Sequence, residues 1–287
     1  MKKIKNGWIN GLIGVCIFAG SLPATRIAVQ DFPPVFLTSI RASIATLFAI
    51  ILLIIFKPPR PQRSHLLSLI ISAVGVIIGF PLLTALALMY VTSAHSIVFV
   101  GLLPMSTAIF AVIRGGEKPK PLFWIFSLIG ALSVAGYSAL DSTGSSLIGD
   151  LLMLLAVIVC GLGYADGARL SRTLGGWQVI SWSLLVSFPI VLPIALVTMP
   201  TSFQYVSTSA WFSLAYVSIF SMLLGFIFWY RGLAQGGIAA VGQLQLFQPF
   251  MGLALASVLL HESISWTMLI ATLVAVVCVA GAKEYAK

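Results

Sequence analysis

Charged residues are scarce in this chain, and their scarcity decides its broad class. Asp, Glu, Lys and Arg make up only 8% of the 287 residues, whereas hydrophobic residues make up 60%. Soluble domains carry about 25% charged residues because their surface faces water. A water-facing surface over most of this chain is therefore excluded, and the composition indicates an integral membrane protein.

Residues that build metal sites, disulfides and catalytic centres are also few. The chain has three cysteines and three histidines, all scattered: Cys16, Cys160, Cys278, His65, His95 and His261. No pair of cysteines indicates a disulfide or a metal site. There is no HExxH or GxSxG motif and no pair of carboxylates at one depth. We therefore expect no cofactor, no bound metal and no enzymatic activity.

Long apolar runs recur along the whole chain instead. Each run of about 20 residues is long enough to cross the hydrocarbon core as a helix. The runs lack the alternation of barrel strands, so helices satisfy the backbone in lipid. The sequence predicts an all-α integral membrane protein with ten transmembrane helices: Trp8–Val29, Val35–Phe56, Leu66–Met89, Ala94–Ile113, Leu122–Leu140, Ile148–Arg169, Trp177–Met199, Ala210–Tyr230, Ile238–Leu260 and Trp266–Ala282.

The net charge of +9 fits a membrane topology rather than nucleic-acid binding. If both termini lie in the cytoplasm, the loops between the ten helices lie alternately inside and outside. Every basic residue except Arg26 and Arg41 then falls on the cytoplasmic side. These two arginines stay within helices near the outer side. The basic residues placed inside are Lys2, Lys3, Lys5, Lys57, Arg60, Arg63, Arg114, Lys118, Lys120, Arg169, Arg172, Arg231, Lys283 and Lys287. The localisation predicted is the cell membrane, as a multi-pass protein of a bacterial inner membrane.

The two halves of the chain resemble each other. A shift of 145 residues aligns Ala94 with Ala239, Pro104 with Pro249, Glu117 with Glu262 and Gly136 with Gly281. Chance alignment of apolar sequence is the alternative. Because five helices is an odd number, the second copy enters the membrane from the opposite side. We therefore predict two inverted five-helix repeats, at residues 1–140 and 147–283, which is a recurring plan of secondary transporters.

The same residues resemble a known family. The stretch from Leu103-Pro104-Met105 to Gly116-Glu117, and its repeat from Gln248-Pro249-Phe250 to His261-Glu262, resembles the signature of the drug/metabolite transporter superfamily. Arg41 and the pair Gly20-Ser21 also match. The resemblance is to EamA-type members with ten helices and covers essentially the whole chain, although His261-Glu262 lacks the usual glycine. It implies a carrier, commonly an exporter of amino acids, related metabolites or drugs.

Four intramembrane prolines mark places where a helix can break, and we predict roles in helix breaking and gating for them. Pro23, Pro81, Pro104 and Pro249 each lack an N–H, so the carbonyl four residues earlier loses its helical donor. Such carbonyls either face a wet cavity or are satisfied by packing. Carrier sites lie near the midplane at the interface of the repeats. We expect the substrate there, among helices 1, 3, 4, 6, 8 and 9.

Polar and aromatic side chains within the predicted helices are the candidates for substrate contact. An unpaired amide in hydrocarbon is costly, so Gln245 and Gln248 either face a cavity or bond across helices. Arg41 binds a substrate carboxylate or forms a structural pair, and Asp166 is expected to pair with Arg169. The complete predicted set is Gln245, Gln248, Arg41, His95, Phe99, Ser21, Tyr164, Trp182, Phe220 and Gln243.

These observations favour a secondary transporter that exports small metabolites, such as amino acids or similar amphiphilic solutes, by alternating access. No carboxylate is evident at mid-depth of the membrane, so we expect uniport down a substrate gradient. If transport is instead coupled to protons, His95 or Asp166 is the residue expected to carry the proton. The alternatives are a proton-coupled drug or multidrug efflux carrier and, from another class, a channel or an intramembrane enzyme. The partners expected are a small-molecule substrate and membrane lipid, without nucleic acid. The sequence leaves monomer and homodimer open.

Overall fold

The computed structural model describes residues 2–115, 120–140, 146–236 and 241–285, and this part of the chain is helical without a strand. The first half contains α1 (Lys2–Ala19), α2 (Ser21–Asp31), α3 (Pro34–Phe56), the 3-10 turn η1 (Arg63–His65), α4 (Leu66–Ser72), the π-helix η2 (Ala73–Gly79), α5 (Phe80–Ala87), α6 (Ser93–Val100), α7 (Leu103–Gly115) and α8 (Pro121–Leu140).

The second half begins with α9 (Leu147–Leu174) and α10 (Gly176–Val197). It continues with α11 (Thr208–Ala215), the π-helix η3 (Tyr216–Leu224), α12 (Gly225–Gly236), the 3-10 segment η4 (Gly242–Phe247), α14 (Gln248–Leu260) and α15 (Trp266–Glu284). The all-helical prediction is therefore confirmed for the described residues.

Seven helical stretches in the described residues are long and apolar enough to cross a membrane. They are 6–31, 34–56, 63–87, 93–110, 147–174, 176–197 and 208–235, and three shorter apolar helices lie at 121–134, 244–260 and 266–278. These stretches correspond in chain order to the predicted helices. A multi-pass membrane protein follows, while the number of ten crossings and the side of each terminus stay predictions.

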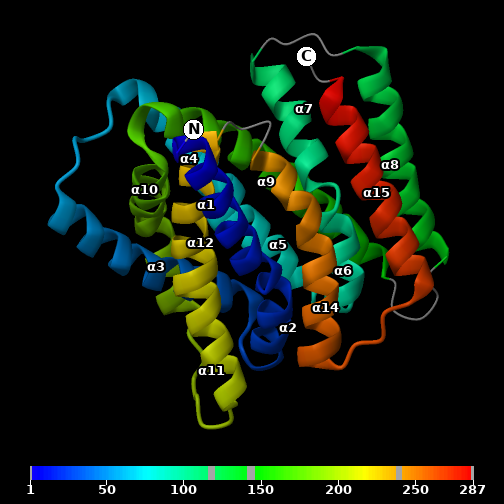
Figure 1. Ribbon diagram of the computed structural model, residues 1–287. Helices are drawn as coiled ribbons and strands as arrows, with labels where there is room; N and C mark the ends of the chain where they lie inside the picture. Colours follow the sequence, from blue (N-terminus) through cyan, green and yellow to red (C-terminus); the bar gives the residue numbers. More distant parts are fainter. Residues whose placement is uncertain (1, 116–119, 141–145, 237–240, 286–287) are drawn as a thin grey trace.

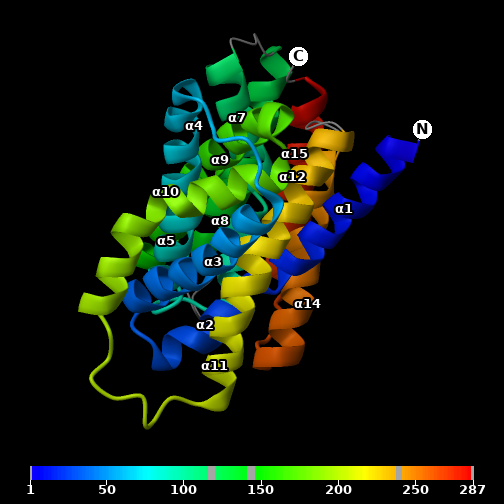
Figure 2. The same cartoon turned by 90° about the vertical axis from the view of Figure 1, so that its left-hand side faces the viewer.

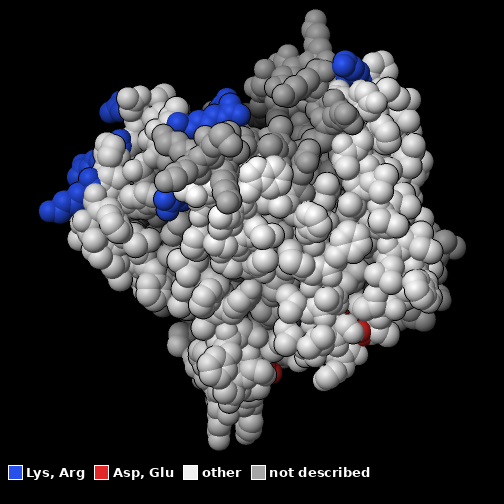
Figure 3. Space-filling view, viewed as in Figure 1, with Lys and Arg blue, Asp and Glu red and all other residues white. Residues whose placement is uncertain are grey.

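Lipid-facing character is visible on the outside of the bundle. Many large apolar side chains are exposed along its length, including Leu47, Ile54, Phe56, Leu132 and Val258. In the view of Figure 3, the Lys and Arg side chains gather at the end of the bundle where α1 begins, and acidic side chains show nearer the opposite end. An apolar belt between a basic and a weakly acidic end is typical of a membrane protein.

Helices from the two halves pack against each other in matched pairs. α3 packs against α10, and α8 packs against α15, which forms the pair on the right of Figure 1. α1 packs against α12, and α5 packs against α9. In the predicted repeat, α1 corresponds to α9 and α12 corresponds to α5. The contact between α1 and α12 therefore corresponds to the contact between α9 and α5. The inverted orientation and the repeat boundaries stay predictions, and Glu117, one of the residues that carries the repeat, lies outside the described residues.

Close helix contacts in the interior depend on small residues. A Cβ added at Gly75 of η2 would lie 2.6 Å from the carbonyl oxygen of Val159 and 2.7 Å from Cα of Gly163. The two backbones of η2 and α9 therefore touch, as small residues permit between membrane helices. Figure 2 shows the elements from the side, with α9 running through the bundle.

Candidate functional site

Within the residues that the structure describes, five predicted helices are interrupted. The first breaks at Gly20, between α1 and α2, and the fourth breaks at residues 101–102, between α6 and α7. The third and eighth contain the π-helices η2 and η3, which occupy equivalent places in the two halves. The ninth begins with η4 before α14. π-helical segments occur frequently at functional sites because they redirect backbone and side chains locally.

The intramembrane prolines lie just after these interruptions. Pro81, Pro104 and Pro249 occupy the second residue of α5, α7 and α14, and Pro23 is the third residue of α2. A proline in the first turn of a helix costs little because the N–H there has no helical acceptor. The prolines therefore start new helical segments beside the interior of the bundle.

A small cavity lies where the interrupted segments meet. Its volume is about 30 Å³. A water needs at least about 10–15 Å³, so the cavity has room for about two waters and is smaller than an amino acid. It is lined by Phe18, Ser21, Leu22, Thr25, Arg41, Val76, Phe80, Pro81, Thr84, Leu103, Cys160, Tyr164, Ser221, Met222, Phe226 and Gln248.

A chain of polar side chains crosses one wall of this cavity. Ser21 Oγ and Ser221 Oγ lie 2.7 Å apart, and Arg41 Nη2 donates to Ser221 Oγ at 3.4 Å. The Oε1 atom of Gln248 is buried without a hydrogen-bond partner in the described structure. The cavity therefore offers a guanidinium donor and an amide acceptor that the protein leaves largely unused.

Arg41 is the positive group of the cavity. Its side chain is 5% exposed, and its Nε has no hydrogen-bond partner among the described residues. As the eighth residue of α3, it lies about 10 Å along the helix from its first residue. A buried charge costs several kcal/mol unless it is paired. The guanidinium of Arg41 is therefore a buried charge without an acidic partner among the described residues.

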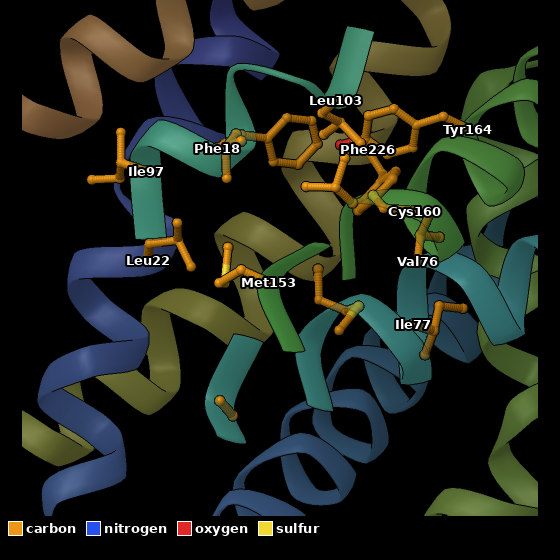
Figure 4. Packing of buried hydrophobic residues seen from close by; sticks show 14 of the residues in the cluster. Phe18, Leu22, Val76, Ile77, Ile97, Leu103, Met153, Cys160, Tyr164 and Phe226 are labelled. Atoms are coloured by element: carbon orange, nitrogen blue, oxygen red, sulfur yellow. The ribbon is translucent and has the colours of Figure 1, made fainter. Parts of the chain in front are cut away.

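Aromatic rings form a further part of the lining. The ring of Phe226 lies 5.0 Å from that of Phe18 and 5.8 Å from that of Tyr164. Figure 4 shows these three rings gathered beside Leu103 and Cys160. Edge-to-face aromatic packing at these separations is favourable, and the rings add apolar surface to the lining of the cavity.

The structure brings Ser21, Arg41, Tyr164, Gln248 and Pro81, all predicted from the sequence, to this one cavity. The other predicted residues do not line it. Gln245 is buried with its Nε2 unpaired in the described structure, and Trp182 lies on α10 against the hydrophobic core. Pro23, Pro104 and Pro249 are not among the lining residues, and the side chain of Gln243 lies outside the described residues.

Phe220 faces away from the cavity. Its side chain is 46% exposed and its ring stacks on Tyr216, with centroids 5.7 Å apart. Phe220 therefore does not belong to the lining of this cavity, and its contribution to the substrate path stays a prediction. The π-helix η3 turns Ser221 and Met222 inward and leaves Phe220 on the outside of the bundle.

His95 and Phe99 belong to a separate buried cluster. His95 Nε2 lies 2.6 Å from Asp150 Oδ1, and the hydroxyl of Tyr137 lies 2.9 Å from His95 Nδ1. The ring of Phe99 packs 5.6 Å from that of His95. His95 is fully buried within the protein. The cluster ties α6 and α8 to the start of α9.

Asp166, Arg26 and Asp31 also lie in helices and have structural partners. Asp166 Oδ1 accepts from Arg169 Nη2 at 3.2 Å, which confirms the predicted pair, and from Ser68 at 3.4 Å. Arg26 donates to the carbonyl of Leu88. Asp31 accepts from Ser207, and Asp150 binds His95.

Sequence reasoning missed several residues of the lining. Ser221, Thr25 and Thr84 are its further polar members, and Met222 and Phe226 are the apolar members nearest to Ser221 in the chain. A hydroxyl within an apolar helix commonly bonds to its own backbone, as Thr84 does to the carbonyl of Phe80. The π geometry that turns Ser221 inward has no residue signature in the sequence.

Comparisons with known proteins agree with this architecture. The sequence matches the EamA-like transporter family over residues 5–139 and again over residues 147–282. It is 60% identical over the full length of both chains to the uncharacterized transporter YdeK of Bacillus subtilis (strain 168). It is 23% identical, over 92% of each chain, to the uncharacterized transporter YoaV of the same organism.

A solved crystal structure shares the fold, with a TM-score of 0.66 over 97% of this chain and 96% of that chain at 16% identity. Two matches to one family along the chain, a full-length relative of high identity and this common fold agree with one another. The chain therefore belongs to the EamA-like transporter family, with two repeats, and is a multi-pass membrane transporter.

Proposed function

We propose that this protein is a secondary transporter of the cell membrane that exports small metabolites bearing a carboxylate, such as amino acids or similar amphiphilic solutes, by alternating access. The single observation that carries the proposal is the cavity at the meeting point of the interrupted helices, whose lining combines Arg41 with aromatic rings.

The mixture of polar and apolar side chains in the lining suits an amphiphilic solute. Arg41 offers a guanidinium, which binds a carboxylate with fixed geometry. Gln248 Oε1 is an unused acceptor for an N–H group of the same solute. Phe18, Tyr164 and Phe226 supply apolar contact for its remaining part. A cationic drug fits this cavity less well because Arg41 repels it.

The shape of the cavity supports alternating access. With room for about two waters, it must widen before a metabolite can enter. The interrupted segments around it, among them η2 and η3, are the places where helices bend with least disturbance of their hydrogen bonds. Matched pairs such as α1–α12 and α5–α9 fit two repeats that exchange shapes.

Proton-coupled drug efflux remains the second candidate because His95 and Asp150 form a buried titratable pair. Its location argues against a direct role, since neither residue lines the cavity. A proton-coupled mechanism predicts that export stops when the proton gradient is collapsed while solute gradients are kept.

The test is a search for transported solutes in two steps. Metabolites that accumulate in cells lacking the protein, and fall in cells overproducing it, are identified by mass spectrometry. These compounds and a ¹³C-labelled mixture of amino acids and small carboxylic acids are then loaded into liposomes that contain the purified protein. We expect carboxylate solutes to leave faster than from protein-free liposomes. Failure of every solute to move under any gradient would remove the transporter proposal.

A further inference from the structure

The guanidinium of Arg41 is a buried positive charge that the described residues leave without a negative partner. Its only hydrogen bond in the described structure is to the neutral hydroxyl of Ser221, at 3.4 Å. Its neighbours in the cavity, including Ser21, Tyr164 and Gln248, are also neutral. The charge of the cavity therefore depends on what occupies it.

The described acidic side chains are engaged elsewhere. Asp150 binds His95, and Asp166 binds Arg169 and Ser68. Asp31 accepts from the backbone N–H of Ser207 at 2.9 Å. Glu262 accepts the backbone N–H groups of Ser93 and Ala94 at 3.0 and 2.6 Å, which caps the start of α6. None of these acidic residues lines the cavity.

A charge in this position controls which steps of the transport cycle are fast. With a carboxylate bound, Arg41 forms a neutral pair, and the site passes between the two faces at low cost. With the cavity empty, the guanidinium must pass through the closed state without a partner, and an unpaired charge inside the membrane is expensive. The loaded carrier therefore reorients rapidly, and the empty carrier reorients slowly.

We propose that the protein is an exchanger, in which each exported carboxylate is matched by an anionic solute that returns bound to Arg41. The inference rests on the proposed function and replaces the net uniport expected from the sequence. Export is then driven by the gradient of the returning solute, without a proton-binding carboxylate in the cavity. The returning solute carries a carboxylate and fits between the hydroxyls of Ser21 and Ser221 and the rings of Phe18 and Phe226.

The experiment compares efflux into two external solutions. Liposomes containing the purified full chain are loaded with the ¹³C-labelled mixture of amino acids and small carboxylic acids. They are diluted into buffer with or without the same mixture unlabelled. Both buffers hold the same chloride, pH and potassium, with valinomycin to clamp the membrane potential. We expect at least tenfold faster release of a labelled compound when the unlabelled mixture is outside.

The stimulation ratio is the release rate with the unlabelled mixture outside divided by the rate without it. Three variants connect this ratio to the charge of Arg41. Arg41→Lys keeps the charge and should keep the external stimulation. Arg41→Gln removes the charge, so the empty carrier reorients freely. The stimulation ratio of its residual transport should therefore fall to about one. Arg26→Gln is the matched control, because Arg26 bonds to the carbonyl of Leu88 and lies outside the cavity, and its ratio should equal that of the unaltered protein.

The outcomes separate the inference from the function on which it rests. Equal release with and without external solute overturns exchange and leaves the carrier intact. A tenfold ratio that persists in Arg41→Gln overturns the role of the charge. Release no faster than from protein-free liposomes in either buffer overturns the proposed function and exchange together. If Arg41→Gln does not fold, the stimulation ratio of the unaltered protein still tests exchange, because that measurement needs no variant.

Discussion

Replacement of Asp150 by Ala should destabilise the protein strongly, because it removes one partner from the buried cluster of His95, Asp150 and Tyr137. The Nε2–Oδ1 distance of 2.6 Å places the two groups in direct hydrogen-bond contact. Removing one partner of a buried pair costs about 3–5 kcal/mol, since the other group stays buried. Asp150 also lies in the first turn of α9, where its charge adds about 0.3–1 kcal/mol through the helix dipole.

A double-mutant cycle isolates the contact itself. The experiment unfolds three variants with SDS in mixed micelles: His95→Ala, Asp150→Ala and the double variant. The loss of helix content is measured to monitor unfolding. The helix-dipole contribution appears in both arms of the cycle and cancels. A hydrogen bond to a charged group contributes about 1.5–3 kcal/mol, so we expect a coupling energy in this range. Tyr137→Phe, which removes the hydroxyl that lies 2.9 Å from His95, should cost about 1 kcal/mol.

The result that refutes this reasoning is additivity. A coupling energy below about 0.5 kcal/mol is the value found for independent sites. It would mean that His95 and Asp150 do not interact in the folded protein in lipid. Asp150→Asn sharpens the comparison, because it preserves the shape and one hydrogen-bond acceptor. We expect it to lose less stability than Asp150→Ala and more than Tyr137→Phe.

Two further predictions concern the cavity and the helix packing. Ser221→Ala removes the acceptor of Arg41, so transport in proteoliposomes should fall about tenfold, since a charged hydrogen bond contributes at least about 1.4 kcal/mol. Ser218→Ala, on the same π-helix but bonded to its own backbone, should transport normally, and equal activity of the two variants would contradict the assignment. Gly75→Val places atoms within 2.6 Å of backbone and should destabilise by about 1–3 kcal/mol in SDS unfolding. Gly136→Ala, where a Cβ meets nothing within 4 Å, should leave stability unchanged, and an equal loss in both variants would exclude the packing explanation.

The sequence was sufficient for the helical class because membrane crossing depends on the length and composition of local runs. The third and fourth helices, predicted at 66–89 and 94–113, show the limit of this reasoning. The third contains the π-helix η2 and the fourth is split at residues 101–102. Prolines indicated interrupted helices, but the form of each interruption depends on packing against neighbouring helices that the local sequence does not reveal.

The candidate site was partly predictable for a similar reason. Arg41, Gln248 and Ser21 stand out as polar residues in apolar runs, and all line the cavity. Phe220 looked equally suitable as a ring within a helix, yet it faces outward, because the register of η3 sets which side chains turn inward. His95 found its partner in Asp150, 55 residues away, and no spacing rule connects such a pair.

Cys160 offers the most direct test of the claim that solutes cross through this cavity. It lines the cavity and is buried, whereas Cys16 is exposed and Cys278 is buried outside the lining. A protein with Cys16→Ala and Cys278→Ala keeps Cys160 as its single thiol, and Cys160→Ala added to it serves as the control.

The measurement is transport before and after N-ethylmaleimide, with the extent of modification read by mass spectrometry. The adduct exceeds a cavity of about 30 Å³, so modification should abolish transport of the ¹³C-labelled solutes, and the control without cysteine should be unaffected. External substrate should also slow the modification. Full modification of Cys160 with undiminished transport, or a Cys160 that stays unmodified during turnover, would contradict a path through this cavity.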